Sequence, residues 1–248
     1  MNRLLYKVCI VTGAARGIGR AVARAFAVEG AIVYGADVLA DELELEMKAL
    51  RDQGLRAIAV PTDLRNPEAI EALVNRVVAD QARVDVLANV AGVIEIKHLE
   101  ETTLEDWETI LNINLRAPFL TCRAVAPVMK QQRSGSIMNV SSRAGVMGFA
   151  DEIAYCASKW GLEGLSRSIA LDLEPFGIAV NTITPGTPTH TSMSEKTYSA
   201  ETRRIWRDPT EIAPAFVHLA LQNPLGIHNQ HVNAWELTQQ LRAQGRVA

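Results

Sequence analysis

Short apolar runs alternate with helical patterns along almost the whole chain. The runs lie near residues 7–12, 31–36, 56–60, 84–88, 136–140 and 178–183, and a final extended piece follows Gln230. Near-continuous apolar strands separated by helices are typical of a parallel sheet that is covered on both faces. Right-handed crossovers then give the doubly wound arrangement, in which a ligand binds at the carboxyl ends of the strands. We therefore predict an α/β fold with one doubly wound parallel sheet and helices on both faces.

No repeat, low-complexity tract or interdomain linker interrupts this alternation. A chain of 248 residues with 48% hydrophobic content can bury one substantial core. We expect residues 1–248 to form a single domain. Residues 235–248 form a helix-like tail after the last extended piece.

Composition excludes several classes of function. The net charge is −3 and no basic cluster is present, so no nucleic-acid partner is expected. No segment approaches eighteen uninterrupted apolar residues, and residues 1–6 contain no apolar stretch of signal length. We expect a soluble, cytoplasmic protein without a membrane partner. Cys9, Cys122 and Cys156 are odd in number and lack a CxxC spacing, which indicates neither a disulfide framework nor a metal site.

A glycine-rich turn follows the first apolar run. Gly13, Gly17 and Gly19 stand between that run and an amphipathic stretch from Arg20 to Glu29. Glycines permit positive φ and let a pyrophosphate approach the backbone N–H groups at a helix start, where the helix dipole favours anions. The spacing differs from the widespread Gly-x-Gly-x-x-Gly fingerprint. Strand, glycine turn and helix together predict a Rossmann-type dinucleotide site.

Tyr155 and Lys159 stand four residues apart at the head of a long helical pattern, and Ser142 lies thirteen positions before Tyr155. Residues at i and i+4 share one face of a helix, so the ammonium can lie beside the phenol. A free phenol has a pKa of about 10, and a nearby cation lowers that value. We expect a lowered pKa that makes Tyr155 a proton carrier. The same spacing also occurs on helices with no catalytic role.

With these pieces in order, the chain resembles the short-chain dehydrogenase/reductase family from about residue 5 to about residue 233. The supporting motifs are Thr12 to Gly19, Asp63-Leu64, Asn89 to Gly92, Asn114, Ser141-Ser142, Tyr155 with Lys159, and Pro185-Gly186. The resemblance implies a catalytic set of Asn114, Ser142, Tyr155 and Lys159. It implies cofactor contacts from Gly13, Arg16, Gly17, Ile18, Gly19, Asp37, Asp63, Leu64, Asn89, Ala91, Gly92, Tyr155, Lys159, Pro185 and Gly186.

The resemblance also assigns individual roles. Asp63 and Leu64 would flank the adenine, and Asn89 would support the central strand beside the cofactor. Pro185-Gly186 would lead into the loop beside the nicotinamide, and Asn114 would hold a water that links Lys159 to solvent. Other interpretations stay open: Asp63 as an N-cap acid, Asn89 and Asn114 as core amides, and Ser142 as a turn residue at a strand end.

The cofactor prediction depends on Asp37, which ends the second apolar run. Its carboxylate would accept hydrogen bonds from the ribose hydroxyls and repel a 2′-phosphate. Arg16 opposes this prediction, because a basic side chain there can meet such a phosphate. We expect NAD rather than NADP.

The predicted reaction is hydride transfer between NAD(H) and a secondary alcohol or carbonyl compound, a polar hydroxy compound such as a sugar or sugar acid. Arg143 and His190 are the candidate substrate contacts, since a guanidinium grips a carboxylate by paired hydrogen bonds. Arg143 could instead be a solvated side chain or pair with Glu152. The alternatives are an NADPH-dependent ketone reductase and a dinucleotide-binding regulator without turnover. A non-redox enzyme would need further acids, and Glu95 and Glu152 are expected to be solvated loop residues.

Two regions depart from the family pattern. The segment between Pro185-Gly186 and Asp208 is shorter than expected, so the substrate lid is predicted to be abbreviated, with Thr189 or Thr191 contacting the carboxamide. The C-terminal tail, residues 235–248, is atypical, because Trp235-Glu236-Leu237 replaces the Asp-Gly-Gly that is expected after the last strand. This helix-like tail could reach a neighbouring subunit or the active-site mouth, or end as a frayed surface segment. By analogy with the family, we expect a homo-oligomer, namely a tetramer.

Overall fold

The computed structural model describes residues 2–247 and contains one seven-stranded parallel sheet. The strands are β1 (Val8–Thr12), β2 (Ile32–Asp37), β3 (Arg56–Pro61), β4 (Val86–Asn89), β5 (Gly135–Val140), β6 (Ile178–Thr184) and β7 (His231–Asn233). They are arranged in the order β3-β2-β1-β4-β5-β6-β7, and every neighbouring pair is parallel. The order reverses between β1 and β4, which is the switch point where such sheets bind ligands. The predicted fold class is confirmed.

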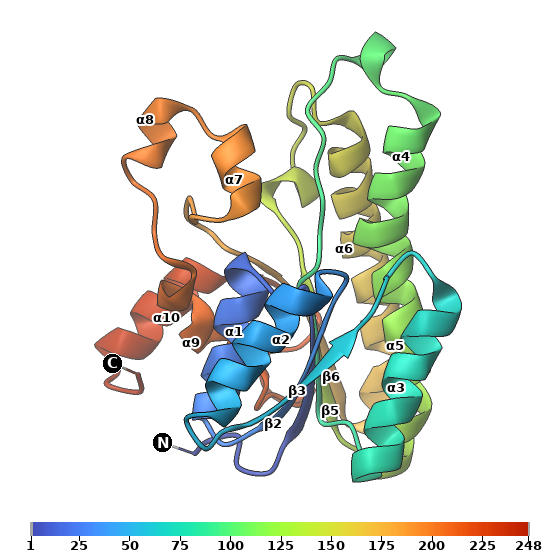
Figure 1. Ribbon diagram of the computed structural model, residues 1–248, viewed down its shortest axis with the longest axis vertical. Helices are drawn as coiled ribbons and strands as arrows, with labels where there is room; N and C mark the ends of the chain where they lie inside the picture. The colour runs from blue at the N-terminus through green and yellow to red at the C-terminus, as the bar shows by residue number, and fades with distance from the viewer. Residues whose placement is uncertain (1, 248) are drawn as a thin grey trace.

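Helices cover both faces of the sheet (Figure 1). One face carries α1 (Gly17–Val28), α2 (Ala40–Arg51), α9 (Ala213–Leu219) and α10 (Ala234–Ala243). The other carries α3 (Pro67–Gln81), α5 (Ala117–Gln132) and α6 (Ile153–Leu173), with α4 (Leu104–Leu111) packed on α6. The short helices α7 (Ser192–Thr197) and α8 (Ala200–Arg203) project beyond the carboxyl ends of the strands.

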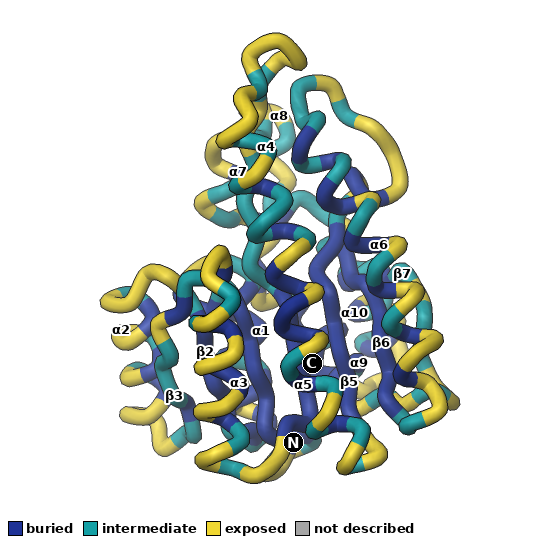
Figure 2. The backbone as a smooth tube through the Cα atoms, turned by 90° about the vertical axis from the view of Figure 1, so that its right-hand side faces the viewer, coloured by how far each residue is buried: buried dark blue, intermediate teal, exposed yellow. Residues whose placement is uncertain are grey.

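The alternation of side chains along the strands divides the apolar residues between two cores. On β1, Cys9 and Val11 face the α1 side, whereas Val8 and Ile10 face the α3 and α5 side. A strand with buried side chains on both faces reads as a continuous apolar run, which is why β1 was visible in the sequence. Figure 2 shows the central strands as buried, the edge strand β3 as largely intermediate, and the projecting part beyond the sheet as largely intermediate or exposed.

Residues Ala234–Ala243, which include most of the C-terminal tail, form the helix α10. Its first residue, Ala234, and its inner residues Thr238 and Leu241 are buried, and the helix α10 packs on α9. The N–H of Trp235 donates to the carbonyl of Pro185 at 3.1 Å. The interpretation of the tail as a frayed segment is therefore wrong, and the tail fixes the loop that follows β6.

Candidate active site

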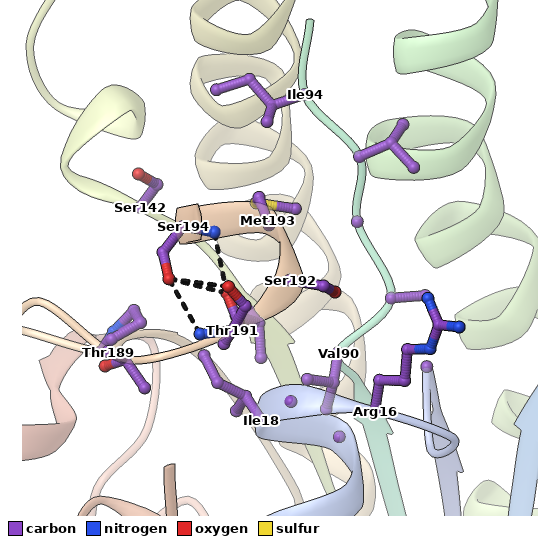
Figure 3. A pocket seen from close by; sticks show the side chains of 18 of the residues that line it. Arg16, Ile18, Val90, Ile94, Ser142, Thr189, Thr191, Ser192, Met193 and Ser194 are labelled. Carbon is purple, nitrogen blue, oxygen red and sulfur yellow. Dashed lines mark hydrogen bonds between the residues drawn. The ribbon is translucent and has the colours of Figure 1, made fainter. Parts of the chain in front are cut away.

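A cavity of about 810 Å³ opens at the carboxyl ends of β1, β2, β4, β5 and β6. Sixteen of the predicted site residues line it: Gly13, Arg16, Gly17, Ile18, Gly19, Asp37, Asp63, Leu64, Ala91, Gly92, Ser142, Arg143, Tyr155, Lys159, Pro185 and Gly186. Asn89, Asn114 and His190 do not. Figure 3 shows side chains from the glycine turn, from the segments after β4 and β5, and from the lid, all pointing into this one space.

The glycine turn between β1 and α1 has no room for a side chain at Gly13 or Gly19. Gly13 and Gly17 adopt φ of +69° and +52°. A Cβ on Gly19 would lie 2.0 Å from the carbonyl oxygen of Gly13, and a Cβ on Gly13 would lie 2.8 Å from the Cα of Ala91. The bare backbone and the free N–H groups at the start of α1 fit a dinucleotide pyrophosphate.

Asp37 lies at the end of β2 and is held by the glycine turn. Its carboxylate accepts the N–H of Ala15 at 3.0 Å and the N–H of Leu39 at 3.1 Å. The Arg16 guanidinium forms an exposed ion pair with Glu42, which raises the pKa of Arg16 further. The geometry therefore presents an acidic group, and not a free basic one, at the place where the second strand ends.

Asp63 lies at the cavity wall and does not cap the next helix. The side chain of Asn66 caps α3 by accepting the N–H groups of Glu68 and Ala69. Asp63 instead pairs with the Arg65 guanidinium at 2.7 Å, which holds the pKa of that carboxyl below its usual range. The N-cap interpretation of Asp63 is wrong.

Tyr155 and Lys159 lie on the first turns of α6, and Ser142 follows β5. The Lys159 ammonium donates to the carbonyl of Val140 at 2.8 Å and lies 5.5 Å from the centre of the Tyr155 ring. A hydrogen bond from Ser142 favours the Tyr155 phenolate. The three groups thus share one end of the cavity, which can hold a substrate oxygen and exchange its proton.

The expected lowering of the Tyr155 pKa is wrong. Burial outweighs the hydrogen bond from Ser142 and raises the pKa of Tyr155 to about 12. Burial likewise lowers the pKa of Lys159 to about 8, although the carboxylate of Glu163 opposes this shift. Desolvation disfavours the charged form of each group, which was not visible from the spacing in the sequence.

Asn89 and Asn114 are core amides behind the cavity. Asn114 lies in a π-helical turn, Asn112–Arg116, accepts the N–H of Val93 at 2.9 Å and donates to the Val93 carbonyl at 2.8 Å. Asn89 donates to the side chain of Asn139 and accepts from that of Thr121, each at 2.8 Å. Asn114 holds the segment after β4, and Asn89 joins β4 to β5.

Glu163 is a polar residue near the site that the sequence reasoning missed. It is buried one helical turn beyond Lys159, where it accepts from Thr182 at 2.9 Å and forms a hydrogen bond with His231 Nδ1 at 2.8 Å. Its position at i+4 from Lys159 was a usable signal, because these positions share a helix face. The contacts to β6 and β7 could not be read from spacing.

Of the two predicted substrate contacts, Arg143 lies at the cavity and His190 does not. Arg143 lines the cavity, where its guanidinium lies 5.4 Å from the centre of the Phe149 ring. His190 is exposed, stacks on Trp206 at 4.4 Å and bonds to Glu195 at 2.9 Å, so its assignment to the substrate pocket is wrong. Thr189 and Thr191, on either side of it, do line the cavity.

The prediction that Glu152 is a solvated loop residue is also wrong. Its side chain is half-buried at the cavity wall. Burial raises the pKa of this carboxyl group. The ion pair considered between Arg143 and Glu152 is absent from residues 2–247.

The described residues contain neither a metal-binding cluster nor a membrane-spanning helix. Within residues 2–247, no group of three or more His, Cys, Asp or Glu side chains is placed to hold a metal ion. In the same part of the chain, no helix has the length and apolar character needed to cross a membrane.

Comparison with known proteins gives concordant matches. Residues 7–202 match the family model described as short chain dehydrogenase. The D-threitol dehydrogenase of Mycolicibacterium smegmatis is 36% identical, over 88% of this chain and 87% of that one. The 3-oxoacyl-[acyl-carrier-protein] reductase of Thermotoga maritima is 35% identical, over 88% and 92%. A candidate NAD(P)-dependent gluconate 5-dehydrogenase from Beutenbergia cavernae, solved with NADP at low occupancy, superposes with a TM-score of 0.85 at 28% identity, over 94% and 98%.

Proposed function

We propose, because this chain belongs to the short-chain dehydrogenase/reductase family, that it interconverts a polar secondary alcohol and its carbonyl compound with NAD(H). The chain is an NAD(P)-dependent oxidoreductase acting on CH–OH groups, as its relatives are. The substrate and the choice of cofactor are our inference. The observation that carries the proposal is the meeting of Ser142, Tyr155, Lys159 and the glycine turn around one cavity.

The cofactor would lie along the carboxyl ends of β1, β2 and β4. The turn from Gly13 to Gly19 would bind the pyrophosphate through backbone N–H groups, Asp37 the adenosine ribose, and Asp63 with Leu64 the adenine. Lys159 would hold the nicotinamide ribose, and Pro185-Gly186 would border the nicotinamide. When bound, the nicotinamide supplies or accepts the hydride.

The protein residues handle the proton. Oxidation takes a hydride from the carbinol carbon and a proton from its oxygen, and Tyr155 accepts that proton as a phenolate. Reduction runs in reverse, with the phenol donating to the carbonyl oxygen. Ser142 would hydrogen-bond the same oxygen, and Lys159 would pass the proton towards solvent through a water held near Asn114.

The preference for NAD is supported by three contacts. The backbone N–H groups of Ala15 and Leu39 fix the Asp37 carboxylate at the end of β2, where it would accept from the ribose hydroxyls. The pairing of Arg16 with Glu42 opposes its use by a 2′-phosphate. The neighbouring structure with bound NADP keeps an NADPH-dependent ketone reductase as the competing proposal.

A polar substrate is supported by the relatives and by the cavity. Relatives include a D-threitol dehydrogenase and a candidate gluconate 5-dehydrogenase. Arg143 and Glu152 place charged groups on the cavity wall, and we propose a sugar or sugar acid as the substrate class. A homotetramer is also proposed by analogy with the family, and in it the exposed Leu104 on α4, Phe119 on α5 and Trp160 on α6 would lie in subunit contacts. We also propose a cytoplasmic location.

The test follows absorbance of reduced nicotinamide with both cofactors, for oxidation of D-threitol, D-gluconate and cyclohexanol and for reduction of cyclohexanone. NAD-linked oxidation of either polar compound, faster than that of cyclohexanol, is the expected result. A preference for NADPH and cyclohexanone would support the competing reductase. Tight dinucleotide binding without turnover on any compound would point to the regulator instead.

A further inference from the structure

Glu152 has a fixed backbone and a side chain that its own helix does not use. The residue immediately precedes α6, and its backbone pairs with that of Lys97 in an isolated bridge. The N–H of Lys97 also donates to the carbonyl of Asp151 at 2.9 Å. No hydrogen bond links the Glu152 side chain to the first turn of α6. The carboxylate lines the cavity three residues before Tyr155.

The Glu152 carboxylate has no protein partner. Among residues 2–247 it makes no hydrogen bond and no ion pair, although it is half-buried. A carboxylate that leaves water without gaining hydrogen bonds is destabilised, and a bound molecule that donates to it would remove that cost. The cavity wall therefore contains an acceptor that only a ligand or water can satisfy.

The same wall contains an equally unpaired donor. Arg143 lies against the Phe149 ring and approaches the sulfur of Met147 at 3.9 Å, but it has no carboxylate partner in the described part of the chain. The phenol of Tyr198, on the lid, lines the same cavity as both charges. Burial raises the pKa of this phenol, the Arg143 guanidinium opposes that shift and the Glu152 carboxylate adds to it. A donor, an acceptor and a phenol thus surround the space beyond Tyr155.

We infer that Glu152 accepts a hydrogen bond from a second hydroxyl of the substrate and that the substrate class is a neutral polyol. This inference rests on the proposed function and narrows its substrate class. A hydroxyl can donate to Glu152 and accept from Arg143 or Tyr198 at once, so neighbouring hydroxyls satisfy both charges. A substrate carboxylate would be repelled by Glu152, and an ammonium by Arg143.

An apolar alcohol is the competing ligand. Ile94 and Met193 also line the cavity, and Figure 3 shows Met193 on the lid helix α7 and Ile94 on the segment after β4. A cyclic alcohol could use these side chains alone. Such a ligand would leave Glu152 and Arg143 unsatisfied, so its turnover should not depend on the Glu152 charge.

The experiment compares wild type, Glu152→Gln and the control Glu95→Gln. Glu95 is an exposed acid on the same segment as Lys97 and does not line the cavity. Values of kcat/KM with NAD are measured for D-threitol, D-gluconate and cyclohexanol. The thermal shift that D-threitol produces on the NADH-loaded protein is a second readout, which is independent of turnover.

Glu152→Gln should lower kcat/KM for D-threitol at least tenfold, which corresponds to about 1.4 kcal/mol, and should reduce the D-threitol thermal shift. The value for cyclohexanol should stay within about twofold, because the amide keeps an acceptor oxygen and loses only the charge. Glu95→Gln should change none of these values. Equal losses on D-threitol and cyclohexanol, or a wild-type preference for D-gluconate, would overturn the inference while leaving a working dehydrogenase. Absence of NAD reduction with all three compounds would remove the proposed function itself, and this inference with it.

Discussion

The two ends of the cavity differ in how their polar groups are satisfied. At the cofactor end, the Thr12 hydroxyl and the Asp37 carboxylate each accept two backbone N–H groups. At the substrate end, the side chains of Glu152 and Tyr198 have no hydrogen-bond partner among residues 2–247, and Arg143 contacts a ring and a sulfur. The first end is organised before a ligand binds, whereas the second is completed by its ligand.

The difference follows from the elements that form each end. The cofactor end is built from strand ends and the turn into α1, where backbone groups fix one another. The substrate end is built from the segment after β5 and from the short helices α7 and α8, which lie beyond the sheet (Figure 1). A cofactor common to many enzymes suits the first kind of site, and a substrate particular to one enzyme suits the second.

Tyr155→Phe should impair catalysis at the substrate end without weakening cofactor binding, and it should have the largest effect on kcat. The phenol exchanges the substrate proton but is not needed at the adenosine end, so we expect kcat to fall by about 10²–10⁴. The dissociation constant of NADH, measured by fluorescence titration, should hardly change. Retention of more than about a tenth of the rate would show that another group moves the proton.

Gly19→Ala should disrupt the cofactor end alone. Its new Cβ would meet the Gly13 carbonyl oxygen at 2.0 Å, so the turn must shift. We expect NADH affinity to fall about tenfold or more, equivalent to about 1.4 kcal/mol, and the free energy of unfolding to drop by about 1–3 kcal/mol.

Gly164→Ala is the matched control for this change. Gly164 lies on α6, and a Cβ there meets nothing within 4 Å. Alanine is a better helix former than glycine by about 1 kcal/mol, so stability should stay equal or rise and NADH binding should be unchanged. Equal losses of NADH affinity in both variants would show that the contact at Gly13 is unimportant.

Asp37→Ala sharpens the comparison within the cofactor end. Removing the carboxylate removes acceptors for the ribose hydroxyls and repulsion of a 2′-phosphate, so the ratio of kcat/KM for NAD over NADP should narrow about tenfold, or about 1.4 kcal/mol. The ratio is measured at fixed ionic strength, because screening weakens the repulsion. A wild-type preference for NADP would overturn the cofactor proposal before the variant is made.

The cofactor end and the sheet were readable from sequence because their signals are local. Strands buried on both faces, such as β1 and β6, appear as continuous apolar runs. The glycine turn is predicted directly by its three glycines, Gly13, Gly17 and Gly19. The helix α1 begins at Gly17, three residues before the expected Arg20, because glycines mask the start of an amphipathic pattern.

The substrate end depends on contacts between distant residues, which no local pattern reports. His190 turns away because it stacks on Trp206, sixteen positions later. The sequence predicts Glu152 as a solvated loop residue, whereas in the structure its backbone pairs with that of Lys97 and its side chain lines the cavity. Likewise, the raised pKa of Tyr155 comes from burial, a property of the packed molecule and not of a spacing.

Glu163→Gln tests the buried carboxylate below Lys159, and of the substitutions considered it should have the smallest effect on activity. The Glu163 carboxylate raises the pKa of Lys159, which burial holds at about 8, so its removal should lower that pKa further. The ammonium is the form present below its pKa. The fall in kcat/KM for reduction with rising pH should therefore begin at lower pH in the variant, with little loss at pH 6.

The measurement is the kcat/KM profile for reduction between pH 6 and pH 10, with Glu174→Gln as the control. Glu174 has an exposed side chain at the end of α6, and His228 is its ion-pair partner, so removing its charge should leave the profile in place. A uniform loss at every pH in Glu163→Gln would indicate that the hydrogen bonds to Thr182 and His231 only maintain the packing of α6. A profile that moves to lower pH with an unchanged plateau would show that the buried Glu163 carboxylate raises the pKa of Lys159. The fixed polar contacts of the cofactor end would then include a residue that lies below the cavity wall.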